Sequence, residues 1–317
     1  MKKILAVLLA AMLLCLLPAC QKKPTEGESS ASGATDSSET HPGSAATSTV
    51  PSVTEPAETS QAATEPPATQ PPATQPPATE PPPAETVRIT IKEGETLTQI
   101  FKKLEQGGVA SFDALMKTAQ SYDYSYYPLI AARPGNAERC FLLEGYLFPD
   151  TYEFYVGMKP QDAIGRFLRN GENRITAAMR QQASALGYSM DEVLTVASLI
   201  QKEGSNPAEV AKIAGVIYNR LNIGMKLQMD ATIVYMEKHV KPFLTGDINR
   251  YNSYYNTDKC RALPAGPIAN PGLTTINAAL HPADVTYLYF FHDPQGNYYY
   301  SNTYEEHEQK IKEINGQ

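Results

Sequence analysis

A glutamate at the end of an apolar helical run is the residue best placed to do chemistry. It is Glu203, in the stretch SLIQKEGSNPAEV, residues 198–210. At helical spacing it shares one stripe with three apolar residues, Val196, Leu199 and Ile200. Partial loss of water and the negative end of the helix dipole would both favour the protonated carboxyl. Such a group can serve as a general acid at a glycosidic oxygen; the alternative is a solvated glutamate at a helix end.

Two predicted helices and a hairpin must position this carboxyl. The first helix spans 189–203, with Ser and Glu at capping-box spacing, and Gly204 ends it. The second begins at 206–209, where Asn, Pro and Glu give an N-cap and a first turn, and it ends at Gly224. The segment TYLYFFHDPQGNYYYSN predicts a β-hairpin that turns at Gly296-Asn297.

The remaining pattern predicts an α+β fold. The segment VRITIKEGETLTQIFKKLEQGGV reads as a strand from Val87, a turn at Glu93-Gly94 and a helix over 96–104. It resembles a LysM-type sugar-binding unit, although an ordinary βα unit is the alternative. A helix over 111–121, extended structure over 141–154 and helical periodicity over 161–186 follow. We therefore expect a small LysM-like βα subdomain with its connecting segment at 87–158 and a mixed α/β catalytic domain at 159–317.

The first 86 residues predict export, anchoring and reach. Residues 1–20 have the charged, apolar and small-residue regions of a signal peptide, and they end in Leu-Pro-Ala-Cys, which resembles a bacterial lipobox. Lipidation of Cys20 would hold the protein at the outer face of the cell membrane; an ordinary signal peptide is the alternative. Residues 21–86 contain no aromatic side chain and end in a repeated ATEPP or ATQPP unit, so we predict a disordered tether.

Charge and cysteine usage exclude several classes of function. The tether carries nine acidic side chains against Lys22 and Lys23, which leaves the rest of the 317-residue chain nearly neutral. This argues against a nucleic-acid partner. Cys140 and Cys260 could pair after export, although nothing in the sequence shows that they are close. The five histidines lack paired helical spacing, so neither a metal site nor a cofactor is predicted.

Several stretches together resemble the endolytic murein transglycosylases of the MltG (YceG-like) family. The matching segments, in order over about 87–315, are LEGYLFPDTY (143–152), ASLIQKE (197–203), VIYNRL (216–221), MKLQMD (225–230), YNT (255–257), LPAGPI (263–268) and NPG (270–272). Members cleave peptidoglycan glycan strands internally. The resemblance therefore implies glycan strands as the substrate and cell-wall synthesis or division proteins as further partners.

The resemblance also implies roles for individual residues. Glu203 matches the family's catalytic glutamate. The family often has a second glutamate at the position of Gln201, whose absence here leaves a single acid in this stretch. Substrate-binding or orienting roles are expected for Glu144, Gln228, Asp230, Tyr255 and Asn256, with a structural cap or ion pair as the alternative for Glu144 and Asp230. The lipobox and tether stand where familiar members have a transmembrane helix.

In a lytic transglycosylase the substrate's own C6 hydroxyl attacks the anomeric carbon, so one carboxyl can act first as acid and then as base. That chemistry fits a lone Glu203. A hydrolase would need a second carboxylate, for which Asp230 or Glu144 is the candidate. A non-catalytic wall-binding lipoprotein that uses its tyrosine-rich loops is a further alternative. A cysteine peptidase using Cys140 is the least favoured, because no helix N-terminus is evident to lower the thiol's pKa.

Overall fold

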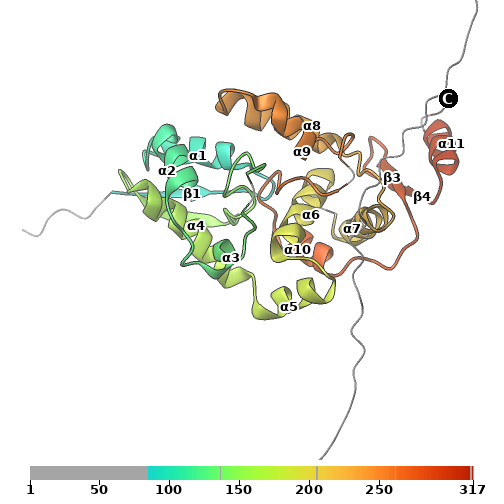
Figure 1. Cartoon of the computed structure of the whole chain (residues 1–317), viewed down its shortest axis with the longest axis horizontal. Coiled ribbons are helices and arrows are strands. Elements are labelled where there is room, and N and C mark those ends of the chain that lie inside the picture. Colours follow the sequence, from blue (N-terminus) through green and yellow to red (C-terminus); the bar gives the residue numbers. More distant parts are fainter. Residues whose placement is uncertain (1–84, 136, 205, 261, 315, 317) are drawn as a thin grey trace, which may run out of the picture. The chain divides into compact units, whose positions relative to one another are not determined.

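The computed structural model describes residues 85–135, 137–204, 206–260, 262–314 and 316 (Figure 1). The first half contains β1 (Thr86–Thr90), α1 (Leu97–Gln106), α2 (Phe112–Ser121), α3 (Pro128–Ala131), β2 (Thr151–Tyr155), α4 (Pro160–Arg174) and α5 (Ala177–Ala185). The second half contains α6 (Met190–Glu203), α7 (Pro207–Asn222), α8 (Asp230–Tyr235), a π-helical turn (Met236–Val240), 3₁₀ turns (Lys241–Phe243 and Ile248–Tyr251), α9 (Asn252–Tyr255), α10 (Leu273–Leu280), β3 (Tyr289–His292), β4 (Tyr298–Ser301) and α11 (Tyr304–Ile314). Helices and small antiparallel sheets together make the fold α+β.

A two-stranded sheet organises the first half. β1 pairs with β2 in antiparallel register, Thr86 opposite Tyr155, although about 60 residues separate the strands. The inward face of β2 packs on α4: the Phe167 ring lies 4.5 Å from that of Tyr152 and 5.5 Å from that of Phe154. α1 begins with a reciprocal capping box between Thr96 and Gln99, and its Ile100, Phe101 and Leu104 are buried in the core. The sheet is therefore stabilised by aromatic packing, not by strand length.

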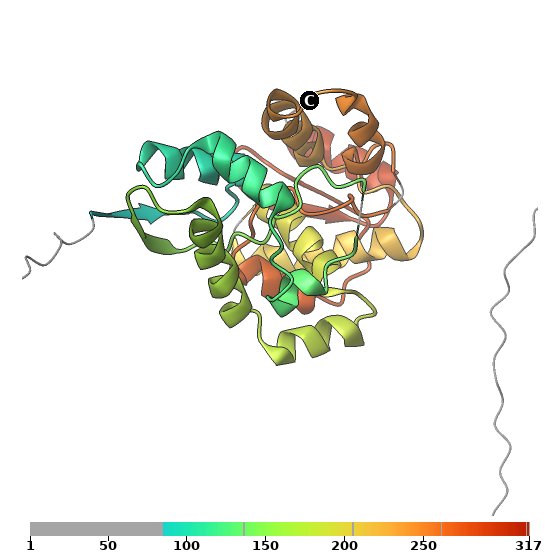
Figure 2. The same ribbon diagram turned by 60° about the vertical axis from the view of Figure 1, so that its left-hand side comes forward.

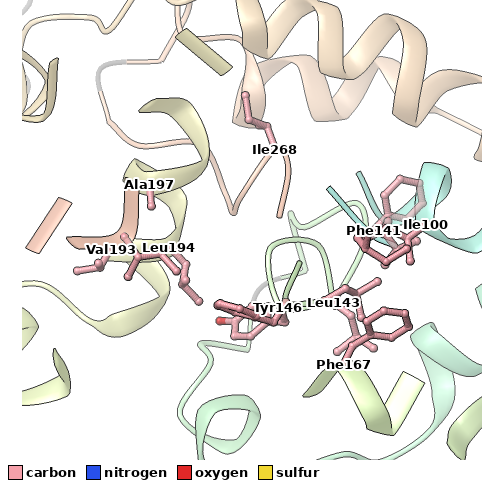
Figure 3. Packing of buried hydrophobic residues seen from close by; sticks show 14 of the residues in the cluster. Ile100, Phe141, Leu143, Tyr146, Phe167, Val193, Leu194, Ala197 and Ile268 are labelled. Atoms are coloured by element: carbon pink, nitrogen blue, oxygen red, sulfur yellow. The ribbon is translucent and has the colours of Figure 1, made fainter. Parts of the chain in front are cut away.

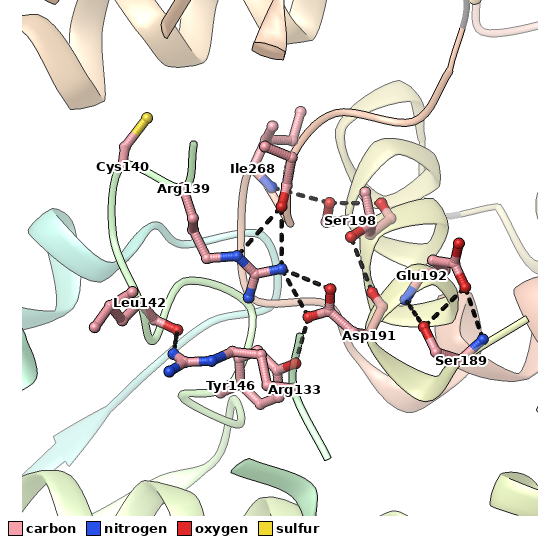
Figure 4. Close-up of polar contacts among 12 residues, drawn as sticks. Arg133, Arg139, Cys140, Leu142, Tyr146, Ser189, Asp191, Glu192, Ser198 and Ile268 are labelled. Atoms are coloured by element: carbon pink, nitrogen blue, oxygen red, sulfur yellow. Dashed lines mark hydrogen bonds and ion pairs between the residues drawn. The ribbon is translucent and has the colours of Figure 1, made fainter. Parts of the chain in front are cut away.

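The segment between α3 and β2 joins this unit to the helices of the second half. Figure 3 shows Leu143 and Tyr146 between side chains of α1 and α4 on one side and of α6 on the other. Beside them, the Arg139 guanidinium donates to both carboxylate oxygens of Asp191 at 2.8 and 2.6 Å (Figure 4). The Tyr146 hydroxyl also donates to Asp191. Asp191 lies in the first turn of α6, so this buried ion pair joins the start of the helix to the segment that contains Arg139.

Several sequence predictions of elements are confirmed. α6 begins after an N-cap at Ser189 with the predicted capping box, and α7 begins after an N-cap at Asn206 with proline in its first turn. The strand beginning at residue 86, the turn at Glu93-Gly94 and the helix α1 also occur where they were predicted, within two residues. The β3–β4 hairpin is present, and Gly296 in its turn has a φ of 85°.

Two predictions of local structure are wrong. Only Thr151–Tyr155 of the segment 141–154 is a strand; the residues before it form buried turns. Gly145 there has a φ of 86°, and a Cβ on it would lie 2.4 Å from Pro267, so close packing against another loop shapes the segment. The helical periodicity over 161–186 belongs to two helices, α4 and α5, which change direction after Arg174 (Figure 2).

Other predictions fall outside the described residues or concern the cysteines. The signal peptide, Cys20 and all of the tether up to residue 84 lie outside the described part of the chain. Within that part, no helix is both long enough and apolar enough to cross a membrane. Cys140 and Cys260 are free thiols and form no disulfide.

Candidate active site

Glu203 opens into a cleft of about 280 Å³ at the end of α6. Four elements line it: α6, α7, the loop into α8, and β3. The lining side chains are Glu203, Arg220, Leu227, Gln228, Met229, Asp230, Phe290, Phe291 and His292. The cleft therefore combines two carboxyl groups, an imidazole and an amide with aromatic rings, which suits a polar ring-shaped ligand such as a sugar.

The carboxyl of Glu203 is partly buried and has a perturbed proton affinity. Loss of water on burial raises its pKa; the nearby charge of His292 lowers it and that of Asp230 raises it further. Among the described residues no group hydrogen-bonds this carboxyl, so its oxygens are available to a ligand in the cleft. A carboxyl with a raised pKa that opens to a cleft is suited to donate a proton to a bound ligand.

A hydrogen bond joins the β3–β4 hairpin to the end of α6. The Tyr298 hydroxyl donates to the Glu203 carbonyl oxygen at 2.9 Å. This close approach requires glycine at the next position, because a Cβ on Gly204 would lie 2.2 Å from the Tyr298 oxygen. The φ of Gly204 is 171°, so glycine is needed here for space and not for a left-handed turn. His292 is the cross-strand partner of Tyr298, and the same contact therefore brings the imidazole to the cleft.

Arg220 connects two of the segments that line the cleft. It lies in the last turn of α7, and its guanidinium donates to the carbonyl oxygens of Lys226 and Leu227 at 3.2 and 2.7 Å. It also donates to the Leu288 carbonyl oxygen and lies 5.0 Å from the Tyr289 ring centre. One buried cation thus ties the loop before α8 to β3.

That loop carries Gln228, whose backbone is strained. Its φ of 51° makes it the one non-glycine residue with a positive φ among the described residues. Hydrogen bonds from the flanking backbone hold this conformation: the Gln228 N–H donates to the Thr257 carbonyl oxygen at 3.2 Å and the Met229 N–H to the Thr257 hydroxyl at 2.8 Å. Strain maintained in this way at a cleft is typical of a side chain held for binding.

Glu144 does not reach this cleft. It is 1% exposed, and its carboxyl accepts hydrogen bonds from the Leu97 N–H at 2.9 Å, the Asn270 amide at 3.0 Å and the Tyr235 hydroxyl at 3.2 Å. Burial raises its pKa to about 8, against the lowering effect of the Leu97 and Tyr235 donors. Glu144 therefore joins the start of α1 to α8, the helix whose first residue is Asp230.

Tyr255 and Asn256 also lie away from the cleft lining. Tyr255 is fully buried, and its hydroxyl accepts a hydrogen bond from the Cys140 N–H at 3.3 Å. The Asn256 side-chain oxygen accepts from the Asp258 N–H at 2.9 Å. These two residues directly precede Thr257, which accepts the hydrogen bond from the Gln228 N–H. The structure thus brings together Glu203, Gln228 and Asp230 of the predicted site and keeps the other three outside it.

Two other residues, Cys140 and Gln201, and one larger hollow are poor candidates for the catalytic site. Cys140 is buried, and burial raises the pKa of its thiol to about 12, which opposes nucleophilic use. The Gln201 side-chain oxygen accepts from the Gly272 N–H and the Thr275 hydroxyl, both at 3.0 Å, and so holds the start of α10. A larger hollow of about 680 Å³ lies at the start of α6, but it contains neither Glu203 nor Asp230.

The sequence did not indicate four residues that form or support the cleft: His292, Arg220, Tyr298 and Thr257. Tyr298 and Glu203 are 95 positions apart, and nothing in the local pattern indicates that the hairpin packs on α6. The motif VIYNRL contained Arg220, and YNT contained Thr257, so the motifs were informative although the roles within them were not.

The chain is similar to several known proteins. Residues 75–313 match the profile of the YceG-like family. An endolytic murein transglycosylase of Bacillus subtilis (strain 168) is 39% identical over 172 residues, 54% of this chain and 47% of that protein. One of Streptococcus pneumoniae serotype 2 is 31% identical over 243 residues, 71% of this chain and 44% of that protein. A crystal structure of a YceG-like protein from Listeria monocytogenes superposes with a TM-score of 0.61 at 31% identity and covers 70% of this chain and 75% of that chain. This chain spans less than half the length of the two transglycosylases.

Proposed function

The chain belongs to the YceG-like family, and on that premise we propose that it is an endolytic lytic transglycosylase of peptidoglycan. It would cleave the β-1,4 bond between MurNAc and GlcNAc within nascent glycan strands and leave 1,6-anhydro-MurNAc ends. The observation that carries this proposal is the Glu203 carboxyl, which has a raised pKa and opens without a protein hydrogen-bond partner, among the described residues, into a cleft. The names of the similar proteins support the same substrate class.

The proposed reaction uses Glu203 twice. Its protonated carboxyl donates the proton to the glycosidic oxygen as the bond to the MurNAc anomeric carbon breaks. The C6 hydroxyl of the same MurNAc then bonds to that carbon, and the Glu203 carboxylate accepts the hydroxyl proton. Glu203 is thereby protonated again, and no water is consumed. The reaction needs neither a metal nor a cofactor.

The other cleft residues have supporting roles in this proposal. Asp230 and His292 act in opposite directions on the pKa of Glu203, so together they set the pH range in which the acid works. Gln228 is the residue best placed to hydrogen-bond a sugar hydroxyl or N-acetyl group, because its backbone is held in a strained conformation facing the cleft. Glu144, Tyr255 and Asn256 position these groups from behind.

The location and the modular organisation are also part of the proposal. A lipid on Cys20 would anchor the protein at the outer face of the membrane, and the tether of residues 21–86 would give it reach toward glycan strands under synthesis. Residues 87–158 would act as a LysM-like unit beside the catalytic domain of 159–317. The pairing of β1 with β2 supports treating 86–155 as one unit.

A hydrolase is the second candidate, and one observation favours it: Asp230 lies in the same cleft as Glu203 and could activate a water. The products distinguish the two reactions. Purified peptidoglycan would be digested with the wild-type chain and with Glu203→Gln, and the ends would be read by mass spectrometry. Anhydro ends from the wild type alone support the proposal. Reducing ends would indicate a hydrolase, and intact but bound glycan would indicate a non-catalytic wall-binding lipoprotein.

A further inference from the structure

A second surface carries exposed aromatic and apolar side chains, and its residues differ from those that line the Glu203 cleft. Tyr122, Tyr126, Tyr155 and Val156 are four of the eight large hydrophobic residues that are exposed in the described chain. Tyr126 is the most exposed of the four, at 61%. Isolated exposed hydrophobic residues are ordinary, but a group of them at one place indicates a binding surface.

Tyr126, Tyr155 and Val156 line a groove of about 440 Å³, a size typical of small-ligand sites. Tyr126 and Tyr127 form one side, and Tyr155 with the residues after β2 forms the other. The first turns of α4 also line the groove, through Gln161, Asp162, Gly165, Arg166 and Arg169. The groove shares no lining residue with the cleft of Glu203.

The tyrosines are held rigidly. The Tyr127 hydroxyl donates to the Gly165 carbonyl oxygen at 3.1 Å, and that of Tyr124 donates to the Gln161 carbonyl oxygen at 3.3 Å. The ring centres of Tyr126 and Tyr127 are 4.6 Å apart. Because these contacts fix the loop to α4, the exposed ring of Tyr126 is presented without the ordering cost that a free loop would incur on binding.

The charges of the groove select the ligand. Arg166 and Arg169 line it with a single acidic residue, Asp162. Arg166 lies 5.5 Å from the Tyr155 ring centre, whereas Arg169 is exposed and has no hydrogen-bond or ion-pair partner among the described residues. Flat rings interspersed with polar side chains suit sugars, which present apolar faces and hydroxyl edges, and an unpaired guanidinium suits a carboxylate.

We propose that this groove is a second, non-catalytic site for an anionic glycan strand, with Tyr126 stacking on a sugar ring and Arg169 pairing with a carboxylate of the strand. This inference rests on the proposed function for the identity of the strand. A site of this kind would hold the polymer while the cleft acts on it elsewhere, and the two sites together would bind a long strand more tightly than either site alone.

The test uses the full chain carrying Glu203→Gln, so that bound strands are not cut. Binding would be measured for glycan strands that carry stem peptides, for strands freed of their stems, and for chitin oligosaccharides, which have no carboxylate. Tyr126→Ala is expected to weaken binding to all three about tenfold, and Arg169→Gln to weaken only the carboxylate-bearing ligands. An effect of Arg169→Gln limited to strands with stems would place the carboxylate on the peptide and not on the sugar.

The controls are Tyr304→Ala and Arg250→Gln, exposed residues that do not line the groove, and both should bind as the parent does. Tyr126→Phe keeps the ring and should stay within about twofold of the parent, which separates stacking from a fold defect. Unchanged affinity in Tyr126→Ala, or no strand binding by the parent, would overturn the proposal. The proposal would also be overturned if Tyr126→Ala and Arg169→Gln lost binding to phosphatidylglycerol vesicles but still bound glycan strands. Whether the wild type cuts the same strands is a separate result, so the groove and the proposed function can fail independently.

Discussion

At the level of single residues, the cleft explains why the Glu203 carboxyl holds its proton more tightly than a solvated glutamate does. Glu203 loses water at the end of α6, and two neighbours act on it with opposite sign, Asp230 raising its pKa and His292 lowering it. Neither neighbour is close to Glu203 along the chain: Asp230 begins α8 and His292 ends β3. The chemistry of the site is therefore a property of the cleft and not of the helix alone.

The opposite signs give a prediction about pH dependence. The alkaline limb of kcat/KM should report loss of the Glu203 proton. Asp230→Asn removes an influence that raises its pKa, so the limb should move to lower pH. His292→Gln removes one that lowers it, so the limb should move to higher pH wherever the imidazole is charged, each by up to about one unit. Asp113→Asn on α2 should leave the profile unchanged. A uniform loss of kcat/KM in both variants, with the alkaline limb unmoved, would contradict these roles.

At the scale of the element, the hairpin must sit on the end of α6 for the cleft to exist. Gly204→Ala should displace it, because the new methyl group would collide with the Tyr298 oxygen at 2.2 Å. We expect a loss of about 1–3 kcal/mol in the free energy of unfolding together with reduced turnover. Tyr298→Phe alone should cost about 1 kcal/mol for one hydrogen bond.

Combining the two changes provides the control. The ring carbon of residue 298 lies 3.3 Å from the added methyl, so Gly204→Ala in the Tyr298→Phe background should cost less than in the wild type. Thermal unfolding of the four proteins measures this coupling. Strictly additive losses would mean that the contact does not hold the hairpin in place.

The Glu144 carboxyl accepts hydrogen bonds from three separate segments of the chain. The free energy of unfolding should therefore depend on its titration. Its pKa is about 8 in the folded chain and near the ordinary carboxyl value when unfolded, so the folded chain binds this proton more tightly. The free energy of unfolding should therefore be highest below about pH 4.5 for this group and fall as the pH rises toward 8, by at most ~1.4 kcal/mol per pH unit. Glu144→Gln should flatten that slope in urea unfolding measured from pH 5 to 8. An unchanged slope in the variant would exclude Glu144 as its source.

The elements show how far the sequence alone could reach. Helix starts were predictable, because Ser189 and Asn206 cap the helices that follow them directly. The hairpin was predictable from its alternating aromatic residues and its glycine turn. The alternation before residue 150 misled, since Leu143 and Tyr146 are buried in turns between two helical groups and not in a sheet. His292 and Arg220 could not be placed in the cleft, because contacts between distant segments carry no local signal.

At the scale of the whole molecule, the sequence places an acidic, proline-rich segment before a folded part that is almost neutral. The proposed anchor at Cys20 would make the reach of the enzyme a property of the chain outside the catalytic domain. Such an arrangement would confine cleavage to glycan near the membrane.

The anchor is tested by comparing two cysteines of the N-terminal segment. Cys20→Ala should abolish incorporation of labelled fatty acid and move the protein from the membrane fraction to the soluble fraction, because a protein without acyl chains loses its hydrophobic attachment. Cys15→Ala, in the apolar run of the predicted signal peptide, should change neither property. Retained labelling in Cys20→Ala would show that the lipobox resemblance had misled.

In the proposed reaction the C6 hydroxyl of MurNAc, and not water, attacks the anomeric carbon, and Glu203 transfers the protons. This mechanism is tested most directly by digesting glycan strands with the wild-type chain in water enriched in heavy oxygen and weighing the new ends. The wild type should give anhydro ends that contain no solvent oxygen, and Glu203→Gln should form them about 10²–10⁴-fold more slowly or worse. New reducing ends that carry the heavy oxygen, or full activity in Glu203→Gln, would contradict this mechanism.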